Sequence, residues 1–325
     1  MTFPLPRNEI SVRDRSERDD LDDIHRGDPR WWGATFVREM TAILPPGMRH
    51  AELVAEVDDV PVAEGAVIGV AGRSGGRAPM SLHVRADMRG RGLGRLLLDR
   101  LLDQTQQWGL PGAGTDVDDR DSGSLDVVRR WGFDVAAHHR ESVLDLRQLD
   151  VVGCERAVGE AERQGYRFVE VSTDDPAFET MYEHLVPLLM SSPDNDTAEE
   201  PLPLPLVRGL TTGAPPMLAV YDGDTLAGLT LLMPRERDEA LNTMFTGVVP
   251  EHRQRGLATA LKAEHALRAR ASGHTRIFTQ NMDGNAPILA ANDRLGFRPD
   301  SGYYELVIDL TRHESLAGPV SRPQP

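Results

Sequence analysis

The sequence repeats itself after 164 residues without a gap, and this repeat limits the possible folds more than any other feature. The register brings identical residues together along the chain: Val84 with Val248, Arg89 with Arg253, Leu97 with Leu261, Thr115 with Thr279, and Leu125 with Leu289. Gly132-Phe133 meets Gly296-Phe297, and Glu141–Leu146 meets Glu305–Leu310. A period of this length is too long for a solenoid unit, so it indicates two copies of one domain.

Each copy is predicted to mix helices and strands. In the second copy, strands over 217–221 and 226–233 flank Asp222-Gly223-Asp224, a tight-turn signal. We then expect a strand over 241–249, a helix over 256–271, a strand over 276–279, a helix over 286–295 and a strand over 303–310. The first copy predicts strands over 67–71, 81–84 and 141–146, with helices over 93–101 and 124–131. A helix over 153–164 and a strand over 166–171 follow.

The chain length of 325 residues also favours two domains, which we place at 1–147 and 148–312. The tail 313–325 is poor in large apolar residues and is predicted to be disordered. The net charge of −15 disfavours nucleic acid and anionic lipid as partners. No apolar run is long enough for a membrane span, and there is no secretory signal. With a single cysteine, Cys154, these features predict a cytoplasmic protein.

The strongest local motif occurs once in each copy, between a predicted strand and a predicted helix. It reads Arg89-Gly90-Arg91-Gly92-Leu93-Gly94 in the first copy and Arg253-Gln254-Arg255-Gly256-Leu257-Ala258 in the second. The first turn of a helix has unpaired backbone N–H groups and a partial positive charge. Gly92 and Gly256 allow the backbone to approach an anion closely. A solvated Arg/Gly turn is the alternative, but two occurrences in one context favour a phosphate-binding loop.

These loops make each half resemble a GNAT N-acetyltransferase, and the chain resembles a tandem GNAT protein. The strands before the loops and the later segments Asn285…Gly296-Phe297 and Trp131-Gly132-Phe133 also carry the resemblance. It implies an α/β (α+β) fold with two GNAT-like domains, each a splayed, mostly antiparallel sheet flanked by helices. It also implies acetyl-CoA as the cosubstrate and no metal. Mycothiol synthase-like and antibiotic-modifying bacterial acetyltransferases are tandem members.

The resemblance further implies which residues contact acetyl-CoA. In the second half these are a strand, the loop and two asparagines: Gly247, Val248, Val249, Arg253, Gln254, Arg255, Gly256, Leu257, Ala258, Asn285 and Asn292. The strand would meet the pantetheine arm, and the loop would hold the pyrophosphate. The first-half equivalents are Val84, Arg89, Gly90, Arg91, Gly92, Leu93 and Gly94.

The catalytic acid and base depart from the family pattern. Many members have a tyrosine acid five residues before the phenylalanine of Gly-Phe, where this chain has Asn292. We expect Tyr303 to replace it, because alternation along the strand leaves only one of Tyr303 and Tyr304 on the cleft side. For the base, the alternatives are a water held by Asn242 and Thr243, or a carboxylate at the strand entrance. The carboxylate candidates are Glu236 and Glu239.

The two halves are not equivalent. Asn285 is replaced in the first half by Asp121, which lies among Asp116, Asp118 and Asp119. An ionised carboxylate cannot donate a hydrogen bond and would repel a phosphate. We therefore expect a catalytic second half, with about one acetyl-CoA bound per chain. The first half is then a degenerate copy, although its intact loop leaves a second cofactor site open.

The sequence thus predicts an acetyl-CoA-dependent N-acetyltransferase. Its partner would be a small-molecule amine, a cationic metabolite or antibiotic, because the chain is acidic. A mycothiol synthase-like enzyme and a non-catalytic acyl-CoA-binding sensor or scaffold are the alternatives. The protein would be a monomer or a homodimer.

Overall fold

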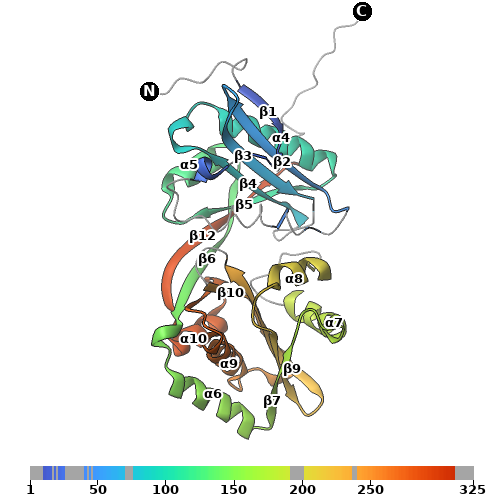
Figure 1. The fold of residues 1–325 in the computed structure, drawn as a ribbon, viewed down its shortest axis with the longest axis vertical. Helices are drawn as coiled ribbons and strands as arrows, with labels where there is room; N and C mark the ends of the chain where they lie inside the picture. The colour runs from blue at the N-terminus through green and yellow to red at the C-terminus, as the bar shows by residue number, and fades with distance from the viewer. Residues whose placement is uncertain are drawn as a thin grey trace, which may run out of the picture. The chain divides into compact units, whose positions relative to one another are not determined.

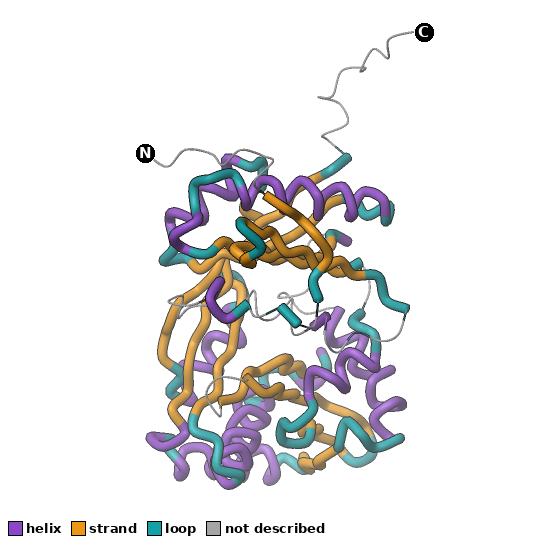
Figure 2. Tube along the Cα trace, turned by 45° about the horizontal axis from the view of Figure 1, so that its top comes forward, coloured by secondary structure: helices purple, strands orange, loops and turns teal. Residues whose placement is uncertain are grey.

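The computed structural model describes residues 10–16, 18–19, 21–25, 40–41, 44, 47–69, 76–190, 201–235 and 240–311. Its internal contacts divide the chain into two compact units. Among the described residues, the first unit comprises those up to 137 together with 304–311, and the second comprises 138–190 and 201–303. Each unit has a sheet with helices against it (Figures 1 and 2).

The first unit has the strand order β1-β2-β3-β4-β5-β12. Its strands are β1 (Ile10–Asp14), β2 (His50–Val57), β3 (Val60–Ile68), β4 (Ala78–Val84), β5 (Gly112–Asp118) and the later part of β12 (Arg298–Asp309), and its helices are α1 (Asp22–His25), α4 (Leu93–Gln107) and α5 (Ser122–Arg130). Leu93 and Leu97 of α4 pack with Ala63, Leu82 and Val84 on one side of the sheet, which we call the α4 face. Because side chains alternate along a strand, the residues between these point to the opposite side. There α1 contacts β3 and β4, and we call this side the α1 face.

The second unit has the strand order β6-β11-β10-β9-β8-β7. Its strands are β6 (Asp134–Asp145), β7 (Tyr166–Val171), β8 (Met217–Asp222), β9 (Thr225–Arg235), β10 (Ala240–Val248) and β11 (Arg276–Met282), and its helices are α6 (Val151–Arg163), α7 (Ala177–Met190), α8 (Leu204–Thr211), α9 (Leu257–Ala271) and α10 (Ala286–Leu295). Leu241 and Ile277 pack with Ala266 on the α9 face. Leu229 packs with Phe178 and Leu185 on the other side, which we call the α7 face.

The last strand of each repeat lies in the sheet of the other. Strand β6 belongs to the first copy but pairs with β11 of the second, from Asp145 opposite Arg276 to His139 opposite Met282. Strand β12 belongs to the second copy but continues into the first sheet beside β5. In Figure 1, the red end of β12 runs into the sheet that contains β3 and β4. A Cβ on Gly112 of β5 would lie 1.9 Å from the carbonyl oxygen of Ile308, so β5 and β12 meet there without room for a side chain.

The repeat itself is visible in the structure. Helices α4 and α9 begin and end 164 residues apart, as do β5 and β11, and β6 and β12. The predicted strand at 166–171 and helix at 286–295 are confirmed residue for residue. The predicted strand at 67–71 is wrong, because β3 ends at Ile68; residues 70–71 and the tail 312–325 lie outside the described residues. The boundaries 1–147 and 148–312 stay a prediction about the repeat, because the compact units also depend on the exchanged strands.

Candidate functional site

The two phosphate-loop candidates have the same geometry. The Nε atom of Arg89 donates to the carbonyl of Val84, and that of Arg253 donates to the carbonyl of Val248, each at 3.0 Å. Gly92 and Gly256 begin α4 and α9 with φ values of 92° and 82°. Neither helix has a side chain that caps its first turn, so backbone N–H groups are available to an anion there.

Both sheets lose their pairing beside these loops. In the second unit, β10 and β11 pair only from Leu241 opposite Ile277 to Thr243 opposite Thr279. In the first unit, β4 and β5 pair only at Ala78 and Pro79. The later residues of β10, including Gly247 and Val248, therefore present backbone groups that β11 does not use. This is the splayed strand pair that the resemblance implies.

A β-bulge distinguishes the second unit. The register between β9 and β10 shifts by one residue between Thr243 and Phe245, whereas that between β3 and β4 runs from Val67 to Ala63 without a shift. The hydroxyl of Thr230 donates to the carbonyl of Phe245 at 3.1 Å, which holds the bulge in place. A bulge redirects backbone N–H groups out of the ladder, so β10 gains groups able to face an acyl oxygen.

A buried carboxylate lies on the α7 face of the second sheet. Glu141 of β6 accepts hydrogen bonds from Arg235 Nη1 at 3.2 Å and from the amide of Gln280. The Arg235 guanidinium also stacks on the ring of Phe278 at 3.8 Å. Burial raises the pKa of the Glu141 carboxyl above its ordinary value, although Arg235 and Gln280 oppose that shift. A carboxylate with a raised pKa is a candidate general base.

Asn242, one of the predicted catalytic residues, faces the same side as Glu141. It is opposite Phe278 in the ladder, and parallel neighbours in register point to one face. Its side chain is 3% exposed, and its Oδ1 has no hydrogen-bond partner among the described residues. An unused buried acceptor is consistent with a bound water. Thr243 follows Leu241 by two residues on the same strand, so it points to the α9 face, opposite to Asn242.

The predicted acid, Tyr303, stacks on His139. The two rings are 4.7 Å apart between centroids and 9° from parallel. Tyr303 and His139 occupy the same position in the two repeats. His139 is two residues from Glu141, so His139 and Glu141 lie on the same face of β6. Tyr304, by contrast, packs against the apolar cluster of the first unit. Of the two tyrosines, only Tyr303 is therefore near Glu141.

The asparagines of the second unit are buried. Asn285 begins α10 without using its side chain as a cap, and it is 7% exposed. Asn292 donates from Nδ2 to Asn281 Oδ1 at 2.9 Å. The hydroxyl of Thr279 donates to the same oxygen at 3.4 Å. Asn292 therefore lies in a polar cluster on the α9 face, while its own Oδ1 has no partner among the described residues.

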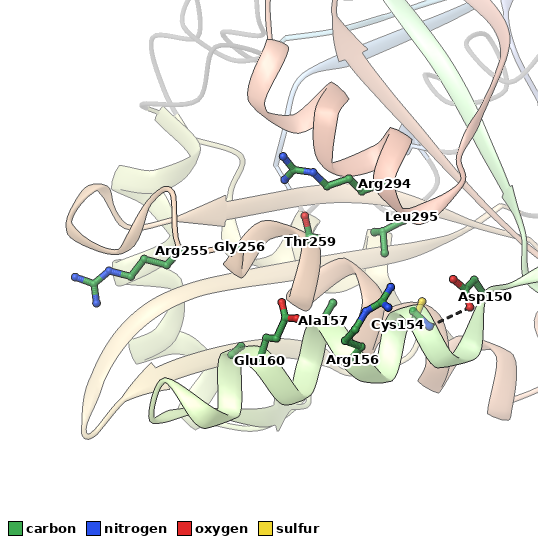
Figure 3. Close-up of a pocket in the computed structure, with 12 residues that line it drawn as sticks. Asp150, Cys154, Arg156, Ala157, Glu160, Arg255, Gly256, Thr259, Arg294 and Leu295 are labelled. Atoms are coloured by element: carbon green, nitrogen blue, oxygen red, sulfur yellow. Dashed lines mark hydrogen bonds between the residues drawn. The ribbon is translucent and has the colours of Figure 1, made fainter.

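A pocket of about 420 Å³ opens beside the second loop. It is formed by α6, α9 and α10, and its lining includes Arg156, Glu160, Gly256, Thr259 and Arg294. Figure 3 shows Arg156 and Glu160 rising from α6 toward α9, whereas the head group of Arg255 points away. Arg255 Nη1 instead donates to the hydroxyl of Tyr166 at 3.1 Å, and that hydroxyl lies 3.0 Å from His252 Nδ1. The loop is thus anchored to β7.

The acidic run of the first unit does not act as the sequence suggests. Asp121 caps α5 by accepting from the N–H of Ser124 at 3.0 Å and from its hydroxyl at 2.7 Å. Asp118 accepts from the backbone and the guanidinium of Arg120. The charges of these two carboxylates are engaged by a helix N-terminus and an arginine. These contacts partly offset the expected repulsion of a phosphate from this half, which stays a prediction.

Two of the predicted base residues cannot be placed, and one candidate was missed. Glu236 and Glu239 lie outside the described residues. Glu141 matches Glu305 in the repeat, but nothing else in the sequence distinguishes it as a base. It reaches the second unit only because β6 is exchanged, and no local pattern shows which sheet a strand will join. The repeated glutamate itself was the available signal.

Comparison with known proteins agrees with this geometry. Residues 18–133, in the first copy, match the sequence model of the Acetyltransferase (GNAT) family. Residues 18–133 therefore have the sequence features of a GNAT acetyltransferase domain. This family transfers acyl groups from acyl-CoA. No curated protein matches the chain in sequence.

Solved structures extend the GNAT fold over nearly the whole chain. A tandem GNAT protein from the clavulanic acid biosynthesis pathway, solved without AcCoA, aligns with a TM-score of 0.68 at 18% identity and covers 96% of this chain and 100% of its own. A GCN5-related N-acetyltransferase from Sphaerobacter thermophilus aligns with a TM-score of 0.61 at 14% identity, over 94% and 96% of the two chains. A putative acetyltransferase from Pyrococcus horikoshii gives 0.59 at 13% identity, over 94% and 91%. At these identities the similarity establishes the fold.

None of the helices in the described part of the chain combines the length and apolar character that a bilayer span requires. Within the same residues, no group of His, Cys, Asp and Glu side chains has an arrangement that holds a metal ion.

Proposed function

We propose that the protein is an acetyl-CoA-dependent N-acetyltransferase whose second unit acetylates the amine of a small, cationic metabolite or antibiotic. The observation that carries this proposal is the end of the β10–β11 ladder at Thr243 and Thr279, between a bulge and an uncapped helix N-terminus. The thioester would enter between the two strands. The pyrophosphate would bind the N–H groups that follow Arg255 and Gly256.

The residues of the α7 face supply the chemistry. Glu141, alone or through a water held by Asn242, takes the proton from the acceptor ammonium. The free amine attacks the thioester carbonyl, and N–H groups near the bulge stabilise the oxyanion. The C–S bond then breaks, Tyr303 donates a proton to the departing thiolate, and the second proton of the nitrogen, lost as the amide forms, returns to the tyrosine oxygen. Holding both substrates in register supplies much of the rate.

The charge of the chain favours a cationic acceptor. Its net charge of −15 attracts cations at long range, and Glu141 is a carboxylate on the proposed acceptor side. Mycothiol synthase-like acetylation belongs to the same reaction class and remains the nearest alternative. A non-catalytic acyl-CoA-binding module is the alternative from another class.

One assay separates these alternatives. Thiol release from acetyl-CoA would be measured against a panel of primary amines that includes glycinamide, histamine, spermidine and kanamycin. We expect release that depends on the amine, with the acetylated product identified by mass. Binding of acetyl-CoA without release for any amine would favour the non-catalytic module.

A further inference from the structure

The first unit contains a buried cluster of two histidines and a glutamate that the proposed function does not use. His25 of α1, Glu64 of β3 and His83 of β4 are 8%, 9% and 6% exposed. His25 Nε2 is in hydrogen-bond contact with Glu64 Oε1. The rings of His25 and His83 are 4.6 Å apart between centroids, at 55°. Burying ionisable side chains costs free energy, even when they are paired as His25 and Glu64 are, so this cluster requires an explanation.

The cluster lies beside the first phosphate loop. His83 directly precedes Val84, whose carbonyl holds Arg89 of that loop. Leu82 and Val84 face α4, so His83 faces the other side, where it is directly opposite Glu64 in the β3–β4 ladder. The β4–β5 pairing has already ended at Pro79 and Gly114. An acyl chain that entered from the loop between β4 and β5 would therefore pass the strand segment that carries His83.

The second unit shows that the fold does not need these charges. The pair that corresponds to His83 and Glu64 in its ladder is Gly247 and Leu229. Leu229 is fully buried in the apolar cluster of the α7 face. A Cβ on Gly247 would lie 2.5 Å from the ring of Phe245, because the bulge places that ring there. At this place in the ladder, the second unit thus has a bulge and a glycine, whereas the first unit has a regular strand and two ionisable residues.

The hydrogen bond within the cluster sets the chemistry of His25. An ionised carboxylate can only accept, so Nε2 is the nitrogen of His25 that donates to Glu64, and in the neutral imidazole Nδ1 then carries the lone pair. Nδ1 is buried and has no hydrogen-bond partner among the described residues. A carboxylate that orients an imidazole whose other nitrogen is unprotonated is the arrangement of a general base.

We propose that the first unit is a second acyl-transfer site, in which the Glu64–His25 pair is the general base for an amine bound on the α1 face. This inference rests on the proposed function, because the first loop would have to bind the same acyl-CoA. The family match over residues 18–133 and the uncapped start of α4 support binding of acyl-CoA by this loop.

The step balances without a further reactant. His25 Nδ1 takes one proton from the substrate ammonium, and Glu64 stabilises the imidazolium through Nε2–H. The amine nitrogen forms a bond to the acyl carbon, the C–S bond breaks, and the electron pair leaves on the CoA sulfur. The thiolate takes the second proton, which the nitrogen loses as the amide forms, so an amide and CoA-SH are the products and the first proton stays on His25 until solvent removes it.

The test removes the second site first. Gly256→Val places a β-branched residue at a positive φ in the second loop, and Gly92→Val makes the matched change in the first. Calorimetry should find two acetyl-CoA molecules on the unmodified chain and one on each variant. The Gly256→Val chain should still release thiol with at least one amine of the panel, since the first unit is intact.

Three substitutions in the Gly256→Val chain then address the base. Glu64→Gln and His25→Gln should each lower thiol release by roughly tenfold or more while acetyl-CoA affinity is kept. The control His50→Gln, an exposed histidine on β2, should change neither. If one of these variants does not fold, nitrogen NMR of the histidine-labelled Gly256→Val chain, which keeps His25 and Glu64, tests the base instead. The measurement is the tautomer of the neutral His25 ring, and the proton is expected on Nε2.

The outcomes separate the two proposals. No thiol release by Gly256→Val, when the unmodified chain is active, would overturn this inference and leave the proposed function standing. Release that Glu64→Gln and His25→Gln leave unchanged, or a His25 proton found on Nδ1, would also overturn it. No release by the unmodified chain with any amine would count against the proposed function itself.

Discussion

At the residue scale, the site depends on a few polar side chains whose surroundings set their chemistry. Glu141 and Cys154 are both buried and both have a raised pKa, but the consequences differ. A carboxyl with a raised pKa becomes a better base near neutral pH, whereas a thiol with a raised pKa becomes less reactive. The basicity of Glu141 and the reactivity of Cys154 can be measured in separate experiments.

Glu141→Gln should lower turnover with the best amine by roughly tenfold to a thousandfold, because the amide cannot take a proton. In the unmodified enzyme the reacting form is the carboxylate. With a raised pKa, kcat/KM should therefore fall as pH decreases through a value above the ordinary 4.5 of glutamate. The pH profile of the variant should lose that acidic limb. Glu305→Gln, at the same repeat position, is the control, and an unchanged profile in Glu141→Gln would exclude Glu141 as the base.

Tyr303→Phe should reduce kcat by roughly tenfold to a thousandfold with little effect on acetyl-CoA binding, as expected for loss of a general acid. Tyr304→Phe keeps the ring in the apolar cluster of the first unit and should be near neutral. Steady-state kinetics and calorimetry measure the two quantities. If both variants retain full kcat, the thiolate is protonated by solvent instead.

Cys154 should be inert in the folded protein. Its side chain is 2% exposed, and burial, with Asp150 and Glu155, raises the pKa of its thiol to about 11. At pH 8 a disulfide reagent should thus detect no thiol before unfolding and one after it. Rapid reaction of the native protein would show that α6 opens readily. The same property leaves the thiol-release assay free of background from the protein.

At the element scale, the contact of β12 with β5 leaves no room for a side chain at Gly112. Gly112→Ala would place a methyl group 1.9 Å from the Ile308 carbonyl oxygen, so the two strands must move apart. Gly114→Ala meets its nearest atom, the carbonyl oxygen of Leu306, at an ordinary 3.7 Å. We expect Gly112→Ala to lower the free energy of unfolding by about 2–4 kcal/mol in urea, and Gly114→Ala by much less. Equal effects would mean that the strands are not joined in this way.

The sequence predicts local features of this fold and misses those that depend on pairing between distant segments. The loop at Arg253 and helices α9 and α10 follow from glycine positions and apolar periodicity, and the structure has them where expected. The bulge at Phe245 leaves no local mark, because it depends on the register with β9. The cluster of His25, Glu64 and His83 was missed for the same reason, since its members are far apart in the chain and meet only through β3, β4 and α1. The capping role of Asp121 at α5 is also typical of its position and was missed as well.

At the scale of the whole molecule, the exchange of β6 and β12 makes each sheet depend on both repeats. Fragments 1–147 and 148–325 each carry a last strand that pairs with the other repeat. Alone, each fragment should self-associate, because a second copy can supply the strand it lacks. Mixed together, they should form a one-to-one complex, which light scattering after size exclusion would identify. Two stable monomers would show that either sheet can be completed by its own repeat.

The exchanged strands also affect how such a protein can change over generations. Two tandem copies of a self-sufficient domain can be separated, lost or recombined one at a time, because each survivor still folds. Here the loss of either repeat would leave the other with an open sheet edge and an unpaired terminal strand. A surviving repeat would then have to exchange its last strand with a second copy of itself, so the loss of one repeat would also change the oligomeric state. The loops and acceptor faces of the two copies remain free to diverge, as the bulge of one unit and the histidine pair of the other illustrate.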